Sequence, residues 1–307
     1  MEPIVIIENL TKKIKGRTII DDVSFQVYKG EVFGFLGPNG AGKTTTIRMI
    51  VGLMNITAGD IKINGFSIQQ NFEKAIRSVG AIVENPEMYK FLTGHQNLQQ
   101  YARMVGGVTE EKVAEVVELV GLSKRINDKV KTYSLGMRQR LGLAQCLLHD
   151  PEVLILDEPT NGLDPAGIRE IRDYLRQLAR EKNMAVIVSS HLLSEMEMMC
   201  DRIGIIQNGK LVDVQQVKDF VTDKEKVYEM EVSPVQEAMD VLKKIFPTLS
   251  IQKTANGISL ALAKESIPDI IKSLVNADIK VYEIKEITKS LEDRFLEITN
   301  RDGGKIL

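Results

Sequence analysis

The sequence predicts an α/β domain with a mainly parallel sheet, followed by a smaller α+β domain. Short, continuously apolar runs alternate with helical patterns up to about residue 213. Such runs are typical of strands buried on both faces, as in a parallel sheet covered by helices. A charged segment at residues 222–226 then resembles a linker, and a new alternation starts after it. We therefore expect domains at residues 1–221 and 222–307.

The elements of the first domain are predicted from apolar runs and a helix start. Residues 31–36, 153–156 and 185–189 are the clearest strands. Asp164-Pro165 supplies an N-cap and a first-turn proline, and the apolar face of the helix that follows is formed by Ile168, Ile171, Leu175 and Leu178. Residues 73–150 have less strand character, which predicts a helical insertion in the sheet domain.

The second domain is predicted to have the order βαββαβ, as in ferredoxin-like folds. Its first strand alternates at residues 228–232, and Ser233-Pro-Val-Gln236 reads as a capping box for a first helix. Asn208-Gly209 predicts a hairpin in the first domain and Asn256-Gly257 predicts one here. We expect a second helix capped by Ser266, a strand at residues 279–284 and a last helix over Leu291 to Ile298.

Composition excludes several classes of protein. The 307 residues carry 40 Lys and Arg against 42 Asp and Glu, interspersed along the chain, so binding to nucleic acid through phosphate neutralisation is not expected. No apolar run approaches the length of a membrane span, and the first residues lack the pattern of a secretory signal. Cys146 and Cys200 lie in apolar helical patterns and are expected to be buried thiols in a reducing cytosol.

The segment from Gly37 to Thr44 matches the pattern G-x-x-x-x-G-K-[ST] between a predicted strand and a predicted helix. Glycines let the loop turn its amides inward, and these amides with the helix N-terminus form a concave site for phosphate oxygens. Lys43 is expected to reach the β- and γ-phosphates and the Thr44 hydroxyl to bind Mg²⁺. The predicted nucleotide-binding residues here are Gly37, Pro38, Asn39, Gly40, Ala41, Gly42, Lys43, Thr44 and Thr45.

Asp157 and Glu158 end the apolar run at residues 153–156, where ligands bind in open α/β sheets. We expect Asp157 to hold Mg²⁺ through water and Glu158 to orient the attacking water. An acidic pair at a strand end is common, so this interpretation depends on the phosphate loop.

His191 follows the run at residues 185–189 and is expected at the same rim, where it can contact the γ-phosphate. The catalytic residues predicted from the sequence are thus Glu158, His191 and Lys43. His95 and His149 are expected to be structural or solvated.

These segments resemble, in this order, the nucleotide-binding subunits of ATP-binding cassette transporters over about residues 4–213. Tyr133-Ser-Leu-Gly-Met-Arg-Gln-Arg140 makes the resemblance specific, because that family carries a serine-glycine signature at a helix start there. The resemblance implies that two cassettes pair head to tail, so that Ser134 and Gly136 of one face the γ-phosphate bound at Lys43 of the other. Ser134 is also a plain N-cap candidate, and the two roles are compatible. Asn161-Gly-Leu-Asp164 is similar to the family's D-loop.

Four positions depart from the usual family pattern. Leu135 replaces the first signature glycine and Met137 the glutamine. Glu84 stands where most members have a glutamine that touches Mg²⁺, so the resemblance implies a place near the metal for it. Ile14 replaces an aromatic residue that stacks on adenine, which leaves the adenine contact open. The glutamate and the Ser-Leu-Gly-Met signature are similar to the branch of bacitracin-resistance and lantibiotic-immunity cassettes. The tail, which ends in residues 291–297, resembles the C-terminal extension common in drug-export cassettes of the same broader class.

The function implied is that of a cytoplasmic ATPase subunit, peripheral to the inner face of the membrane, which uses ATP and Mg²⁺. Its partners would be a second cassette, identical or different, and a separate integral membrane permease that exports a drug or peptide antibiotic. Residues 84–98 would form the groove for a cytoplasmic helix of that permease. No nucleic-acid partner and no direct membrane insertion are expected.

Two alternatives remain at this point. A non-transport ATPase of the same superfamily usually has a long coiled-coil insertion or two cassettes in one chain, and neither is present. A nucleotide-dependent binding module with a ligand-sensing tail would release no phosphate. The tail itself is expected to stabilise the dimer, with permease contact or regulator binding as the other roles.

Overall fold

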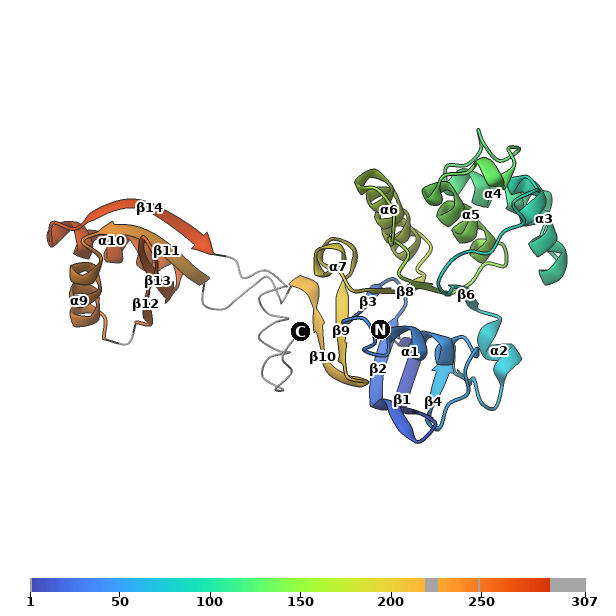
Figure 1. Cartoon of the computed structure of the whole chain (residues 1–307), viewed down its shortest axis with the longest axis horizontal. Coiled ribbons are helices and arrows are strands. Elements are labelled where there is room, and N and C mark those ends of the chain that lie inside the picture. The colour runs from blue at the N-terminus through green and yellow to red at the C-terminus, as the bar shows by residue number, and fades with distance from the viewer. Residues whose placement is uncertain (1, 219–225, 248, 288–307) are drawn as a thin grey trace. The chain divides into compact units, whose positions relative to one another are not determined.

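Residues 2–218, 226–247 and 249–287 are described in the computed structural model (Figure 1). The chain divides into two compact units, residues 1–217 and 218–307. The expected boundary at 221–222 and most of the expected linker fall on residues 219–225, outside the described residues.

The first unit contains two sheets. The strands β1 (Pro3–Ile14), β2 (Arg17–Tyr28), β4 (Ala58–Ile63) and β5 (Phe66–Ser67) form an antiparallel sheet in the order β2-β1-β4-β5. The second sheet has the order β10-β9-β3-β8-β7-β6 and is formed by β3 (Val32–Leu36), β6 (Val79–Ile82), β7 (Val153–Asp157), β8 (Ala185–Ser190), β9 (Arg202–Gln207) and β10 (Lys210–Gln216). All neighbours in it are parallel except β9 and β10, a hairpin that turns at Asn208 and Gly209. The mainly parallel sheet predicted from the sequence is confirmed.

One hydrophobic core joins both sheets to α1 (Lys43–Ile50). Ile47 and Ile50 of α1 pack with Phe33 and Phe35 of β3 and with residues of β1 and β4 in this core. Every residue of β3, β7 and β8 is buried, as expected for strands with both faces covered. The helix α1, which follows the phosphate loop, is therefore packed in this core.

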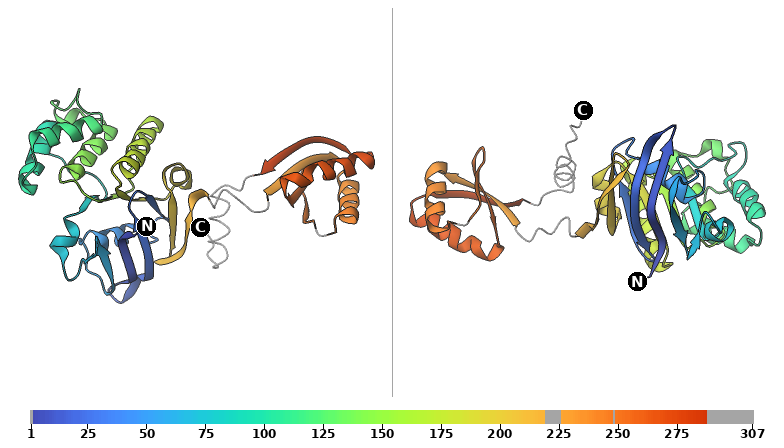
Figure 2. Two further views of the ribbon diagram at one scale, coloured as in Figure 1. Left: turned by 180° about the vertical axis from the view of Figure 1, so that it is seen from behind. Right: turned by 90° about the horizontal axis from the view of Figure 1, so that it is seen from below.

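Four α-helices and one 3₁₀ turn of the described residues lie between β5 and β7. They are α2 (Phe72–Ile76), α3 (Gly94–Val105), α4 (Glu110–Leu119), the 3₁₀ turn η1 (Val130–Thr132) and α5 (Leu135–Leu147). Figures 1 and 2 show α3, α4 and α5 grouped beside the β6 end of the sheet. The expected helical insertion at residues 73–150 needs one correction, because β6 lies inside it and pairs in parallel with β7. Four residues form too short a run to stand out beside the helical patterns around it.

Two further helices cover this sheet, α6 (Pro165–Glu181) and α7 (Leu193–Met199). The start predicted for α6 is confirmed, because the Asp164 side chain accepts a hydrogen bond of 2.9 Å from the Gly167 N–H. Ile171, Leu175 and Leu178 are buried, whereas Ile168 is half-buried. No helix among the described residues is both long and apolar enough to cross a membrane.

The second unit has an antiparallel sheet in the order β12-β13-β11-β14. Its elements are β11 (Lys226–Ser233), α9 (Val235–Ile245), β12 (Ile251–Lys253), β13 (Gly257–Leu262), the 3₁₀ turn η2 (Lys264–Ser266), α10 (Ile267–Asn276) and β14 (Lys280–Ile287). The capping box at Ser233 was a wrong prediction: the N-cap of α9 is Pro234, and no side chain caps the helix. Ser266 is at the N-cap of α10 but makes no side-chain cap bond there. The helix expected over 291–298 lies outside the described residues.

Both thiols are free and buried, as predicted. Burial raises the pKa of the Cys146 thiol to about 12 and raises that of Cys200 as well, because desolvation disfavours the thiolate. His149 is held by the Val79 carbonyl oxygen at 3.0 Å, and His95 lies 3.3 Å from a Glu110 carboxylate oxygen. Neither histidine has a place in the site described below.

These thiols give a simple test of the fold. The thiolate, not the thiol, attacks a disulfide reagent and releases the reagent's other half as a thiolate, so both cysteines of the native chain should react at pH 8 at least about a thousandfold more slowly than a free thiol. In denaturant both should react at the rate of a free thiol, measured by absorbance of the released reagent. Rapid modification of either cysteine in the native chain would contradict this packing.

Candidate functional site

The loop between β3 and α1 is shaped by glycines. A Cβ at Gly37 would lie 2.3 Å from the Ile206 carbonyl oxygen, and one at Gly42 would lie 2.4 Å from Ile20 Cδ1. Gly42 is also the N-cap of α1, with a φ of 113° that side chains rarely adopt. The first N–H groups of α1 therefore open onto the loop, where an anion can approach them closely.

Lys43 is buried although it is charged. Its Nζ donates to the carbonyl oxygens of Gly37 at 2.7 Å and Pro38 at 3.4 Å, and it lies 3.4 Å from Glu158 Oε1. Only 6% of the side chain is exposed, so the ammonium is held inside the loop by these oxygens. Within the described part of the chain, Glu158 is the one carboxylate paired with this buried cation, so Lys43 can attract a further anion.

A cavity of about 300 Å³ adjoins this loop. Its lining combines loop residues with side chains from other elements, namely Ile19, Asn39, Gly40, Gly42, Lys43, Thr44, Thr45, Glu158, Asn161 and His191. The sequence therefore predicted most of this lining, while Ile19 was missed. Ile14, which is 40% exposed, does not line the cavity, so Ile19 is the aliphatic side chain at its edge.

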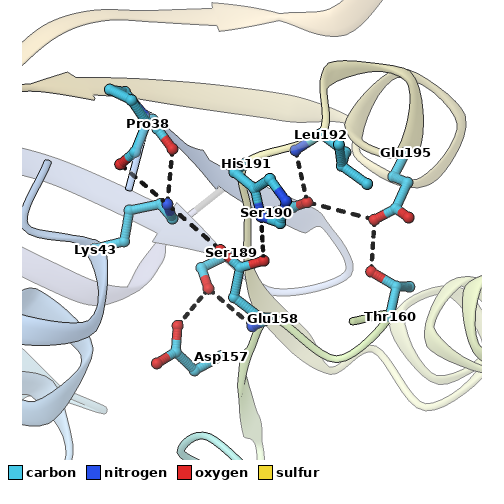
Figure 3. A network of polar contacts seen from close by, with 11 residues as sticks. Pro38, Lys43, Asp157, Glu158, Thr160, Ser189, Ser190, His191, Leu192 and Glu195 are labelled. Carbon is cyan, nitrogen blue, oxygen red and sulfur yellow. Dashed lines mark hydrogen bonds and ion pairs between the residues drawn. The ribbon is translucent and has the colours of Figure 1, made fainter. Parts of the chain in front are cut away.

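Asp157 and Glu158 are fixed at the end of β7 by a serine of the neighbouring strand. Ser189 Oγ donates to Asp157 Oδ1 at 2.5 Å and accepts from the Glu158 N–H at 3.0 Å (Figure 3). Asp157 and Ser189 are buried, and Glu158 has a φ of 52°, an uncommon backbone conformation for a side chain of this size. Ser189 thus holds both the last residue of β7 and the backbone of Glu158, the residue that follows the strand.

Glu158 lies between a lysine and a histidine. Its Oε1 faces Lys43 Nζ, and its Oε2 is 2.7 Å from His191 Nδ1 (Figure 3). The Glu158 side chain is 22% exposed and that of His191 36% exposed, so water can reach both. The three residues predicted to be catalytic are therefore in one chain of contacts at one rim of the sheet.

A second set of polar side chains is buried behind this rim. Thr160 Oγ1 donates to Glu195 Oε2 at 2.5 Å, and Ser190 Oγ donates to the same oxygen at 3.3 Å. Ser190 Oγ also accepts from the Leu192 N–H at 3.0 Å. Sequence reasoning missed these residues and Ser189, although two serines at the end of an apolar strand, directly before a candidate histidine, were a usable signal.

Ser134 and Gly136 do not line the cavity of their own chain. Ser134 is the N-cap of α5, and its side chain accepts a hydrogen bond of 3.2 Å from the Met137 N–H. Leu135 packs on the loop after β7, where its Cδ2 lies 3.0 Å from the position of a Cβ at Gly162. The signature segment is thus built as a helix start outside the cavity of its own chain.

Glu84 is also apart from the cavity. Its Oε1 is paired with Arg48 of α1, and its side chain is 62% exposed. The ion pair connects α1 to the segment after β6, so Glu84 is tied to the phosphate loop through the helix that follows that loop. A metal role for Glu84 stays a prediction.

The cavity fits a nucleotide with Mg²⁺ by its donor chemistry. Mg²⁺ usually takes one or two protein oxygens and completes its shell with water and phosphate oxygens. Thr44 supplies a hydroxyl at the cavity and Asp157 a buried carboxylate beside Glu158. The described residues hold no cluster of three or more His, Cys, Asp or Glu side chains suited to a metal.

Comparisons with known proteins agree with one another. Residues 20–161 match the family model described as ABC transporter. The chain is 65% identical over 306 residues to an uncharacterized ABC transporter ATP-binding protein of Bacillus subtilis (strain 168), covering 100% of this chain and 99% of that protein. It is 39% identical over 307 residues to the bacitracin transport ATP-binding protein of Bacillus licheniformis, over 100% of both. A solved structure of an ATP binding subunit of an ABC transporter has a TM-score of 0.63 and 29% identity, covering 71% of this chain and 91% of that one.

Ser189 gives a test of how the acidic pair is held. Ser189→Ala removes the donor to the buried Asp157 carboxylate and the acceptor of the partly buried Glu158 N–H, and should lower the free energy of unfolding by about 1–3 kcal/mol. The exposed strand residue Ser24 accepts from the Asn9 N–H at 2.8 Å, so Ser24→Ala is a matched control. It should cost at most about 0.5 kcal/mol, since water replaces the lost partner. Urea unfolding measures both, and equal losses would contradict the structural role of Ser189.

Proposed function

Because the chain belongs to the ATP-binding proteins of ABC transporters, which hydrolyse ATP to power a membrane permease, we propose that this hydrolysis takes place at the cavity of Lys43. The single observation that supports this assignment is the placement of Glu158 between Lys43 and His191. One carboxylate meets the cation of the phosphate loop at 3.4 Å and an imidazole at 2.7 Å, at the mouth of a glycine-lined cavity.

Each of the three side chains has a role that follows from its position. Phosphoryl transfer to water needs a neutralised phosphate and an oriented water, and little covalent chemistry from the protein. Lys43 neutralises the β- and γ-phosphates, whose oxygens replace the loop carbonyls as its partners. Glu158 orients and polarises the attacking water. His191 holds Glu158 through Nδ1, and its other ring nitrogen contacts the γ-phosphate.

We assign the Mg²⁺ ligands to Thr44 and, through water, Asp157. When bound, the ion supplies charge that offsets the phosphate oxygens. Ser189 already holds Oδ1 of Asp157, so this carboxylate is oriented before any ion arrives. Glu84, whose carboxylate pairs with Arg48 of α1, is kept as a proposed further contact of the ion.

Two cassettes are proposed to enclose each nucleotide. Ser134 and Gly136 lie outside the cavity of their own chain, whereas the start of α5 offers a hydroxyl and helix N–H groups suited to an anion. A second chain, identical or different, would place this helix start over the γ-phosphate bound at Lys43. Asn161, which lines the cavity, would lie close to that interface.

The permease is proposed to dock on the segment after β6. Tyr89 and Phe91 are 54% and 68% exposed, and their ring centroids are 5.8 Å apart. Exposed aromatic side chains that contact each other are typical of protein interfaces. Such docking would place the subunit at the inner face of the membrane, where cytoplasmic ATP is available.

A peptide antibiotic is the proposed exported substrate. The relative that transports bacitracin is similar over both units of this chain, not only over the cassette. Relatives named for lantibiotic transport match 67% of this chain at 41% identity. These similarities support a substrate class but no single compound.

Replacing the proposed base tests the site and the dimer together. Glu158→Gln should bind ATP but hydrolyse it at least about a hundredfold more slowly, because the amide cannot polarise water as a carboxylate does. The variant should then accumulate as an ATP-dependent dimer in size-exclusion chromatography. Adding Ser134→Arg should abolish that dimer while leaving the nucleotide bound. Hydrolysis at the wild-type rate by Glu158→Gln would refute the assigned role.

Glu84 gives a separate test of coupling to the permease. Glu84→Gln removes a negative charge and its pair with Arg48 from an exposed surface, so ATP affinity of the isolated chain should change by less than about threefold. The stimulation of ATP hydrolysis by the permease should change, measured with both subunits in vesicles. An unaltered stimulated rate and unaltered transport would remove Glu84 from the mechanism.

A further inference from the structure

Glu195 is a buried carboxylate that none of the roles above uses. It lies in the first turn of α7 with 7% of its surface exposed. Its Oε2 accepts from Thr160 Oγ1 at 2.5 Å and from Ser190 Oγ at 3.3 Å (Figure 3). One oxygen atom therefore joins the segment after β7 to the end of β8.

These two segments carry the groups that meet at the cavity. Thr160 is two residues after Glu158 and directly before Asn161, and Ser190 directly precedes His191. Ser190 Oγ also accepts from the Leu192 N–H at 3.0 Å, which fixes the backbone on the far side of His191. Glu158 and His191 are partly exposed and lie 2.7 Å apart. The residues near them in the sequence that bind Glu195, Thr160 and Ser190, are buried.

Burial of the Glu195 carboxylate between two loops is unfavourable in free energy unless its oxygens are hydrogen-bonded. Taking it out of water costs several kcal/mol unless hydrogen bonds replace its hydration. Here the two hydroxyl donors, Thr160 and Ser190, provide that replacement. These hydrogen bonds fix the Thr160 and Ser190 hydroxyls in direction as well as in distance, whereas apolar packing between two loops would not fix a direction.

We propose that Glu195 is a positioning residue for ATP hydrolysis. Through Thr160 and Ser190 it holds the loops of β7 and β8 in one register, so that Glu158 keeps its contact with His191 and Asn161 keeps its place at the cavity. Glu195 itself touches no nucleotide. The proposal rests on the roles assigned above to Glu158 and His191.

The experiment uses the full chain and measures kcat, KM and ATP affinity. Thr160→Val keeps the shape of the side chain but removes the donor, and kcat should fall about tenfold or more while ATP affinity changes less than about threefold. Thr160→Ser keeps the hydroxyl and should restore most of kcat. Glu195→Ala should lower kcat at least as much as Thr160→Val, if the variant folds.

Glu31 provides the matched control. It is also a buried carboxylate, but it precedes β3 at the opposite end of the strand and binds Arg202 at 2.9 Å. Glu31→Ala removes a buried carboxylate without touching the cavity, and kcat of the folded variant should stay within about threefold of the wild type. A kcat for Thr160→Val equal to that of Thr160→Ser, or no lower than that of Glu31→Ala, would overturn the proposal.

Glu158→Gln separates this proposal from the proposed function. If Glu158→Gln abolishes hydrolysis while Thr160→Val leaves kcat unchanged, only the positioning role of Glu195 is wrong. If Glu158→Gln hydrolyses ATP at the wild-type rate, the assigned site is wrong and the positioning role is wrong with it.

Discussion

The parallel pairing of β3, β8 and β7 is the constraint on which the site depends. These strands lie side by side and run in the same direction, so their carboxyl ends open at one rim of the sheet. Lys43 follows β3, Glu158 follows β7 and His191 follows β8. Lys43 and Glu158, more than a hundred positions apart in the sequence, therefore form an ion pair at 3.4 Å, and His191 lies 2.7 Å from the same carboxylate.

Buried polar contacts then convert this proximity into a defined geometry. Ser189 holds Asp157 and the backbone of Glu158, and the carboxylate of Glu195 joins the two loops behind them. Each of these groups lies in a setting where an unpaired polar atom costs about 1–3 kcal/mol, so the contacts favour one arrangement over the alternatives. Lys43 is buried in the phosphate loop, whereas Glu158 and His191 are partly exposed, so water can reach them.

The sequence was most informative where chemistry and backbone geometry coincide. The phosphate loop could be predicted because Gly37 and Gly42 occupy places where a Cβ would clash, and the acidic pair because it ends an apolar run. The pairing of Ser189 with Asp157 and that of Glu195 with Thr160 could not be, since these partners are 32 and 35 residues apart and only the strand order brings them together. The strand β6 was not predicted because its four residues are too short a run to be distinguished from the helical patterns around it. The capping box predicted at Ser233 was wrong because the N-cap of the helix is Pro234. Short-range patterns thus predicted the elements, while the contacts across strands required the fold.

Phosphate release from ATP by the Lys43→Ala variant tests the central claim most directly. Lys29 precedes β3 as Lys43 follows it and pairs with Glu152 at the surface, so Lys29→Ala controls for the loss of one positive charge. With ATP and Mg²⁺, the account predicts that Lys43→Ala releases phosphate at least about a hundredfold more slowly than the wild type, while Lys29→Ala releases it at the normal rate. Phosphate release at the wild-type rate by Lys43→Ala would contradict the account.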